Sequence, residues 1–90
     1  MVNPYDDQRV DDKKFIRVFE ENVDSKELIW HRDKKNRVVR VLEGNSWKLQ
    51  YDNQLPFEMV ENEEYFIEAY QYHRIIKGRN NLVLEILEKT

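Results

Sequence analysis

Short runs of branched aliphatic and aromatic residues recur along the chain, and clusters of polar residues separate them. A spacing of about 8–12 residues between such runs is typical of an all-β sandwich or barrel. We expect strands at Phe15–Phe19, Glu27–Asp33, Arg37–Glu43, Ser46–Asp52, Phe57–Val60, Tyr65–Glu68, His73–Lys77 and Leu82–Leu87. One alternative stays open, because Asp24-Ser25-Lys26-Glu27 also resembles the start of a helical turn.

Two of the polar separators have the composition of tight turns. Gly44-Asn45 lies between two predicted strands and predicts a two-residue hairpin in which Gly44 takes a positive φ. The segment Gly78-Arg79-Asn80-Asn81 predicts the last hairpin of the chain. Between these turns, Trp47, Leu49 and Tyr51 alternate with polar residues, so their side chains should share one buried face.

The length of the chain and its N-terminal composition bound the domain organisation. A chain of 90 residues supports one small hydrophobic core. Residues 1–14 are mostly polar, and we interpret them as an N-terminal arm or a short edge segment. Residues 15–90 then form a single all-β domain.

Charge and cysteine content exclude several classes of function. The 15 Lys and Arg and the 18 Asp and Glu give a net charge of −3 and are spread along the chain, so we expect no nucleic-acid partner. The absence of Cys excludes disulfides and Cys-based metal sites. No stretch reaches the roughly 18 apolar residues of a membrane span, and the N-terminus lacks the apolar region of a signal peptide. We therefore expect a cytoplasmic protein without a membrane partner.

The only two histidines, His31 and His73, are the candidates for chemistry. His31 and Asp33 are two residues apart, and in a strand such a pair points to one face. Two His and one carboxylate form a set that holds Fe(II) and leaves positions open for substrate or O₂, and the same set suits Zn²⁺. The sequence therefore predicts a divalent-metal site at His31, Asp33 and His73. An ordinary exposed or buried His–Asp pair is the alternative interpretation.

The spacing around these residues resembles the two motifs of the cupin superfamily. The first stretch reads His31-x-Asp33-x₃-Arg37-x₆-Gly44, and the second reads Asn62-x₅-Glu68-x-Tyr70-x₂-His73. The register matches over both stretches, from His31 to about Lys77. The resemblance implies a cupin-like double-stranded β-helix, the RmlC-like jelly roll, with a metal site. It also implies a small-molecule ligand, Fe(II), Mn or Zn as the metal, and, for an enzyme, oxygenase (dioxygenase-like) or isomerase chemistry.

The chain departs from the cupin pattern at several positions. Asp33 stands in place of the second His and still provides a ligand, whereas Arg37 replaces the Glu ligand and cannot coordinate a cation. In the second motif, residues 62, 68 and 70 replace Gly, Pro and Gly, so other residue types must build the turn before His73.

These departures leave more than one function open. In the first hypothesis, Arg37 contacts an anionic group of the substrate, and Tyr65 or Tyr72 hydrogen-bonds a ligand at the metal. In the second, Asp33 and Arg37 form an ion pair in a metal-free module with a ligand-binding or assembly role. The order of the ligands also resembles 2-oxoglutarate-dependent oxygenases, but no basic residue stands clearly at the place that their co-substrate requires.

The run Leu82–Leu87 is almost continuously apolar. A strand of this kind is either covered on both faces or left as an edge that pairs with another copy. Small cupin-like domains are commonly dimers, and from the burial argument and the resemblance together we expect a homodimer.

Overall fold

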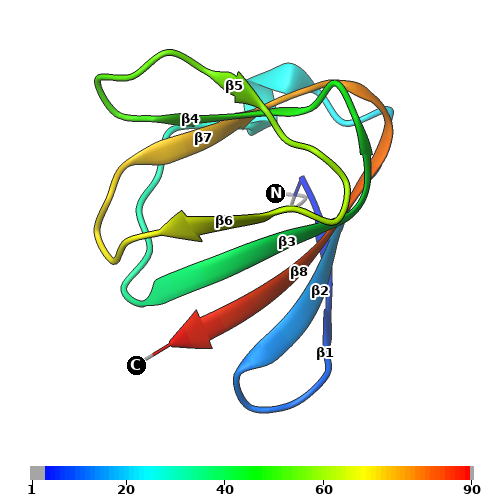
Figure 1. The fold of residues 1–90 in the computed structure, drawn as a ribbon. Coiled ribbons are helices and arrows are strands. Elements are labelled where there is room, and N and C mark those ends of the chain that lie inside the picture. The colour runs from blue at the N-terminus through cyan, green and yellow to red at the C-terminus, as the bar shows by residue number, and fades with distance from the viewer. Residues whose placement is uncertain (1–3, 90) are drawn as a thin grey trace.

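The computed structural model describes residues 4–89, so residues 1–3 of the predicted arm and residue 90 lie outside the described residues. The chain forms two antiparallel sheets that face each other, one above the other (Figure 1). The five-stranded sheet has the order β1 (Asp6–Arg9), β2 (Lys14–Phe19), β8 (Arg79–Lys89), β3 (Asn36–Asn45) and β6 (Glu64–Ile67). The three-stranded sheet has the order β5 (Phe57–Glu58), β4 (Lys48–Tyr51) and β7 (His73–Ile76). The predicted all-β architecture is confirmed.

One predicted strand, Glu27–Asp33, is wrong. The chain instead makes a short 3₁₀ helix, η1 (Ser25–Glu27), and the Asp24 carboxylate caps it by accepting the Lys26 backbone N–H at 3.0 Å. The alternative of a helical turn at this position is therefore confirmed. The local cap decided the conformation, because satisfying the first free N–H favours the turn over an extended chain. Only His31 keeps a strand contact, through an isolated bridge to His73.

Both predicted hairpins are also wrong, because at each of them the chain crosses from one sheet to the other. β3 and β4 belong to different sheets, and so do β7 and β8. Gly44 has no positive φ; the left-handed residue at the first crossing is Ser46, with φ 63°, and at the second it is Asn80, with φ 59°. Asn80 lies within the second predicted turn, whereas Ser46 lies at the start of a predicted strand. Pairing across each turn does not follow from turn chemistry alone.

Gly78 brings the two crossings into contact. A Cβ atom at this position would lie 2.3 Å from the backbone nitrogen of Trp47 and 2.4 Å from the carbonyl oxygen of Asn45. Only glycine permits this approach of two backbones, because the neighbouring atoms belong to the main chain and cannot rotate away.

The hydrophobic core fills the space between the inner faces of the two sheets. The predicted alternation of β4 is confirmed, since Trp47 and Leu49 are fully buried and Tyr51 is half-buried against the core. The other buried apolar side chains come mainly from β2, β3 and β8 and are Phe15, Phe19, Val23, Val39, Val41, Met59, Ile67, Leu82, Leu84 and Ile86.

β8 is a central strand, paired with β2 on one side and β3 on the other. The alternative that Leu82–Leu87 forms an open edge is therefore wrong. Its inward residues are buried, while Val83 and Leu87 on the outer face are only half-buried. The homodimer stays a prediction, because a single chain does not test it.

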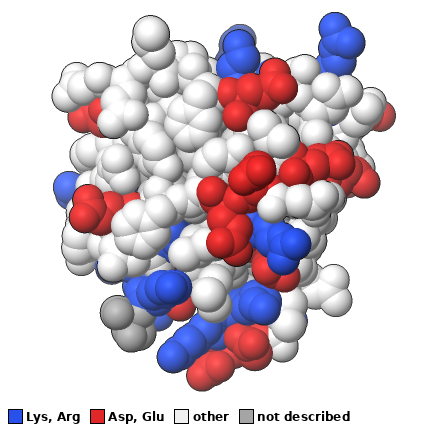
Figure 2. Space-filling model, in the orientation of Figure 1, with Lys and Arg blue, Asp and Glu red and all other residues white. Residues whose placement is uncertain are grey.

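The surface carries charges of both signs. Figure 2 shows acidic side chains in a band across the middle of one face, with basic side chains beside and below them. Within residues 4–89 no helix is long and apolar enough to cross a membrane.

Candidate metal centre

A two-way backbone bridge brings the two histidines together. The His31 N–H donates to the His73 carbonyl at 3.0 Å, and the His73 N–H donates to the His31 carbonyl at 2.9 Å. Residues directly opposite each other in an antiparallel pair project to the same side. The segment that follows η1 is thereby fastened to the start of β7, and both imidazoles are held on one side.

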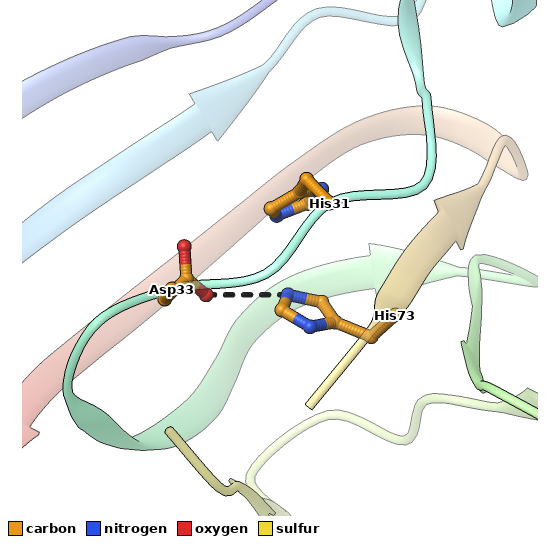
Figure 3. A group of neighbouring side chains, drawn as sticks. All are labelled: His31, Asp33 and His73. Atoms are coloured by element: carbon orange, nitrogen blue, oxygen red, sulfur yellow. Dashed lines mark ion pairs between the residues drawn. The ribbon is translucent and has the colours of Figure 1, made fainter. Parts of the chain in front are cut away.

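Asp33 completes a cluster with these imidazoles (Figure 3). The two rings stand edge to face with their centroids 4.3 Å apart, and Oδ2 of Asp33 lies 3.3 Å from Nε2 of His73. One ligand atom from each of the three residues lies within 4.8 Å of the others. His73 is 3% exposed, so the cluster reaches into the interior. The structure thus brings the three predicted ligands together.

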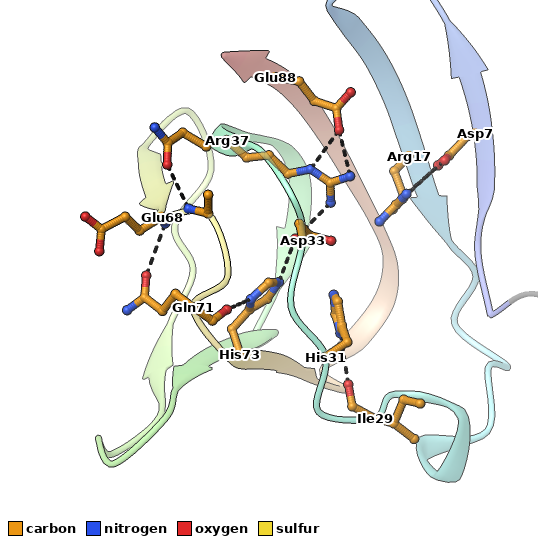
Figure 4. A network of polar contacts seen from close by, with 12 residues as sticks. Asp7, Arg17, Ile29, His31, Asp33, Arg37, Glu68, Gln71, His73 and Glu88 are labelled. Atoms are coloured by element: carbon orange, nitrogen blue, oxygen red, sulfur yellow. Dashed lines mark hydrogen bonds and ion pairs between the residues drawn. The ribbon is translucent and has the colours of Figure 1, made fainter. Parts of the chain in front are cut away.

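Hydrogen bonds to the backbone define the tautomer of each imidazole (Figure 4). Nδ1 of His31 lies 3.0 Å from the carbonyl oxygen of Ile29, and Nδ1 of His73 lies 2.8 Å from that of Gln71. A carbonyl only accepts, so each Nδ1 carries a proton, and a ring that is neutral then has its lone pair on Nε2. Both lone pairs are then available to a metal, with ring orientation fixed by the second nitrogen.

The contact between Asp33 and His73 therefore joins two acceptors. Oδ2 of Asp33 is buried and makes no hydrogen bond with any residue from 4 to 89. Burial lowers the pKa of His73, an effect to which the nearby His31 and Arg37 add, while the bond to Gln71 and the Asp33 carboxylate act in the opposite direction. The neutral ring is thus favoured, and its lone pair faces a carboxylate oxygen. A cation between these two atoms satisfies both of them, so the donor set fits a divalent metal.

Arg37 is held by two carboxylates. Its Nη1 lies 3.1 Å from Asp33 Oδ2, while Nε and Nη2 donate to Glu88 Oε2 at 3.2 and 2.9 Å. The ion pair of the second hypothesis is present, together with the close imidazoles of the first. Contact between Arg37 and a substrate stays a prediction, and the observed partners give this side chain a positioning role. Sequence reasoning missed Glu88, whose only signal is its place opposite Arg37 once the pairing of β3 and β8 is known.

Tyr65 lies away from the cluster. Its hydroxyl accepts the backbone N–H of Val60 at 2.8 Å, and its ring packs against Phe57 with centroids 5.5 Å apart. It does not line the cavity onto which the cluster opens. The predicted catalytic role of Tyr65 stays a prediction, and the contacts observed for it support the loop before β6.

A cavity of about 380 Å³ opens beside the cluster. Most of its wall is apolar and comes from both sheets, and the residues are Phe19, Leu28, Ile29, Val39, Leu49, Met59, Ile67, Ile75, Leu84 and Ile86. Its polar wall includes Arg17, which sequence reasoning missed. The signal was present, because Arg17 alternates with Phe15 and Phe19 and so shares their inward face. Apolar pockets with a few polar groups are typical of small-molecule sites.

No family model matches the chain, and no curated protein does. Solved structures do. An RmlC-like cupin family protein with a double-stranded β-helix fold, from Methanocaldococcus jannaschii, aligns with a TM-score of 0.71 over 97% of this chain and 81% of that one, at 12% identity. The chain has the cupin fold. The resemblance to the cupin superfamily read from the two motifs is confirmed at the level of the fold.

Two larger cupin-fold matches have names that describe enzymes. A structure of the DMSP lyases RdDddP and RnDddQII aligns with a TM-score of 0.72 at 13% identity, covering 86% of this chain and 37% of that one. A structure of Fe(II)-HppE with the alternative substrate (S)-1-HPP aligns with a TM-score of 0.64 at 17% identity, covering 84% and 41%. This chain thus spans less than half the length of either protein. At these identities the matches establish the shared fold.

The second cupin motif is built without its glycines. Asn62 and Tyr70, which stand where the motif has Gly, both take the left-handed conformation, with φ 70° and 64°. The backbone N–H of Tyr70 donates to the Asp33 carbonyl at 2.7 Å, which ties this strained turn to the cluster. Non-glycine residues thus take a conformation that glycine adopts easily, at a cost of about 1–2 kcal/mol for each left-handed residue.

Proposed function

We propose that the protein is a metal-dependent cupin that binds one divalent cation through Nε2 of His31, Nε2 of His73 and Oδ2 of Asp33. We propose further that it acts on a small molecule held in the adjoining cavity. The observation that carries this proposal is the 3.3 Å approach of two buried acceptors, Asp33 Oδ2 and His73 Nε2, with no hydrogen bond between them. Without a cation this contact places a lone pair against a carboxylate in a poorly solvated site.

The charges around the cluster support this assignment. Arg37 approaches Asp33 and by itself would oppose a bound cation, but Glu88 accepts two hydrogen bonds from the same guanidinium. Glu88 therefore offsets much of the positive charge of Arg37 and leaves the Asp33 carboxylate able to serve a metal as well. Arg37 in turn holds that carboxylate in place, as partners of ligating carboxylates do.

Fe(II) is the metal that the donor set favours, with Mn and Zn as the alternatives. Two imidazoles and one carboxylate on one face are typical of non-haem Fe(II) sites. The name of the HppE structure includes Fe(II), which supports the same choice. When bound, the metal supplies a Lewis acid and a place for O₂ or a substrate oxygen, which suits oxygenase or isomerase chemistry.

The protein's own residues bind and orient the substrate. The apolar wall contributed by β3, β4 and β8 excludes water from the space beside the cluster. The two histidines keep their rings in one orientation because each donates Nδ1–H to a backbone carbonyl. Arg37 keeps the Asp33 carboxylate facing His73.

A second candidate function is a metal-free ligand-binding or assembly module. The ion pair between Asp33 and Arg37 favours it, since this pair neutralises the carboxylate without a metal. The two candidates differ in whether the isolated chain retains metal.

Elemental analysis of protein purified without chelator tests the proposal, followed by calorimetric titration of the metal-free protein with Zn²⁺, Mn²⁺ and anaerobic Fe(II). We expect close to one equivalent of metal. His31→Ala should reduce it to less than about a tenth of an equivalent. Because His31 is only half-buried, this variant should fold, whereas His73→Ala opens a buried site. Glu58→Gln, an exposed carboxylate on β5, is the matched control and should bind metal as the wild type does.

Two results would contradict the proposal. Less than about a tenth of an equivalent in the reconstituted wild type would favour the metal-free module. Equal binding by the wild type and His31→Ala would show that the metal sits elsewhere.

A further inference from the structure

Arg17 faces the same cavity as the metal cluster, from the wall formed by β2. Its side chain is 11% exposed and lies between the buried rings of Phe15 and Phe19 along the strand. Leu84 of β8 lies opposite it in the pairing register. A guanidinium in such apolar surroundings needs partners for its N–H groups, so the partner of each group matters.

The carboxylate of Asp7 accepts hydrogen bonds from one side of this guanidinium (Figure 4). Nε donates to Asp7 Oδ1 at 2.8 Å and Nη2 donates to Asp7 Oδ2 at 2.9 Å. The ring of Tyr5 covers the plane of the guanidinium, with the central carbon 3.6 Å from the ring centroid. These contacts fix the orientation of Arg17 while the partner carboxylate sits on the exposed edge strand β1.

Nη1 of Arg17 has no partner among the residues that the structure describes. It forms no hydrogen bond or ion pair with any residue in the range 4–89. In Figure 4 the end of Arg17 that is turned away from Asp7 points toward the side where Asp33 and His31 lie. The Nη1 donors of a fixed, largely buried cation thus face a cavity whose wall is mostly apolar.

The paired charges around the cavity indicate what this donor binds. Arg17 and Arg37 are set against three carboxylates, Asp7, Asp33 and Glu88, which leaves one negative charge. A divalent cation at the cluster turns this into one positive charge, and a monoanion restores neutrality. Glu27 also lines the cavity, but within residues 4–89 it forms no ion pair with Arg17 or Arg37, so it does not belong to this paired set.

We propose that Arg17 is the subsite for the carboxylate of a small monocarboxylic acid. Nη1 donates to the carboxylate, the short apolar body of the ligand packs against Leu84 and Ile86, and its other end reaches the cluster. A carboxylate fits better than a phosphate, because desolvating a second negative charge against an apolar wall costs more. The assignment of the far end rests on the proposed metal function, whereas the contact at Arg17 needs no metal.

Calorimetric titration with pentanoate and with pentanamide, which has a similar shape and no charge, tests this proposal. We expect pentanoate to bind at least about tenfold more tightly than pentanamide, since a hydrogen bond to a charged group is involved. Arg17→Gln should abolish this preference. Asp7→Asn should tighten pentanoate binding several-fold, because it removes the carboxylate that competes for Arg17. An Arg17 that serves only as the partner of Asp7 predicts no such gain.

The titrations are run on zinc-loaded and on metal-free protein, and the metal content of each sample is measured. A preference for pentanoate in the metal-free protein that depends on Arg17 supports the subsite even if no metal binds, and the proposed metal function then fails alone. Metal binding with equal affinity for pentanoate and pentanamide overturns the subsite and leaves the metal function intact. Tighter binding of inorganic phosphate than of pentanoate also overturns it.

Discussion

The two ends of strand β7 lie in very different surroundings. At its start, His73 meets Asp33 and His31, and a buried carboxylate oxygen there makes no hydrogen bond. Beyond its far end, the backbone of Gly78 packs directly against the backbone of the other crossing, at Asn45 to Trp47. The buried indole of Trp47 in that region donates to the carbonyl oxygens of Arg79 and Asn80 at 3.1 and 3.3 Å.

This difference separates stability from function within one small core. At the crossing end the Trp47 indole is hydrogen-bonded and the backbones beside Gly78 are in close contact, so we expect this end to contribute more to the free energy of unfolding. At the cluster end, Asp33 Oδ2 is ion-paired with Arg37 but has no hydrogen-bond donor among residues 4–89, and Tyr70 is left-handed. Both features cost free energy in the metal-free protein. Local conflicts of this kind are typical of functional sites, which the remainder of the fold stabilises.

Gly78→Ala should have the largest effect on stability. The new methyl group would meet main-chain atoms of Asn45 and Trp47 at 2.4 and 2.3 Å, so the two crossings must separate. We expect the free energy of unfolding to fall by about 3 kcal/mol or more, measured by urea denaturation. Gly44→Ala is the control, because its methyl group would meet the rotatable Cδ1 of Leu82 at 2.8 Å. Equal losses in the two variants would argue against a special role for the crossing.

Tyr51→Phe should have an intermediate effect. The Tyr51 hydroxyl of β4 donates to the Phe66 carbonyl of β6 at 2.6 Å and thereby joins the two sheets. Its loss should lower the free energy of unfolding by about 0.5–1.5 kcal/mol at pH 7. Urea denaturation of both proteins at several pH values measures this difference.

The same substitution predicts a pH dependence. Burial, with a smaller effect of Tyr65, raises the pKa of Tyr51 above its usual value of 10.0 in the folded protein. The unfolded chain therefore loses this proton first, and the wild type loses stability relative to Tyr51→Phe as the pH rises above about 10. A difference between the two proteins that stays constant from pH 9 to about 11 would contradict the shift.

The sequence predicted the strands of this protein better than the segments that connect them. Runs of apolar residues located the strands around Phe15–Phe19 and Leu82–Leu87. Alternation identified the buried face of Trp47, Leu49 and Tyr51, because burial of one face leaves a period of two. The sheet crossings near Gly44 and Gly78 were not predictable, since a tight turn does not determine which strands pair. The segment after Asp24 forms η1 and not a strand, because the Asp24 side chain caps the turn.

The candidate site divides in the same way. His31, Asp33 and His73 were found from scarcity, spacing and the cupin resemblance, and they do converge. Glu88 was not found, because its role depends on the pairing of β3 with β8. Arg17 was missed although its alternation with Phe15 and Phe19 placed it on the inward face of β2. Partners that come from pairing across a sheet are visible only once the register is known.

Asp33→Asn should have the smallest effect on stability, and it tests the comparison most sharply. Removing one member of a buried ion pair normally destabilises a protein by about 3–5 kcal/mol, because the other charge is left unpaired. Here Arg37 retains Glu88, and the new amide can donate to His73 Nε2, which faces an acceptor in the wild type. We expect the free energy of unfolding of the metal-free protein to change by less than about 1 kcal/mol.

Added metal should stabilise the wild type but not Asp33→Asn. A cation that binds only the folded state stabilises it by about 2.7 kcal/mol when its concentration is a hundred times the dissociation constant. Zn²⁺ should therefore raise the thermal unfolding midpoint of the wild type and leave that of Asp33→Asn unchanged. Thermal denaturation of both proteins with and without Zn²⁺ measures this. If Asp33→Asn instead unfolds the metal-free protein, then the Asp33–Arg37 pair is part of the framework. The contrast between a stable crossing end and a functional cluster end would then be wrong.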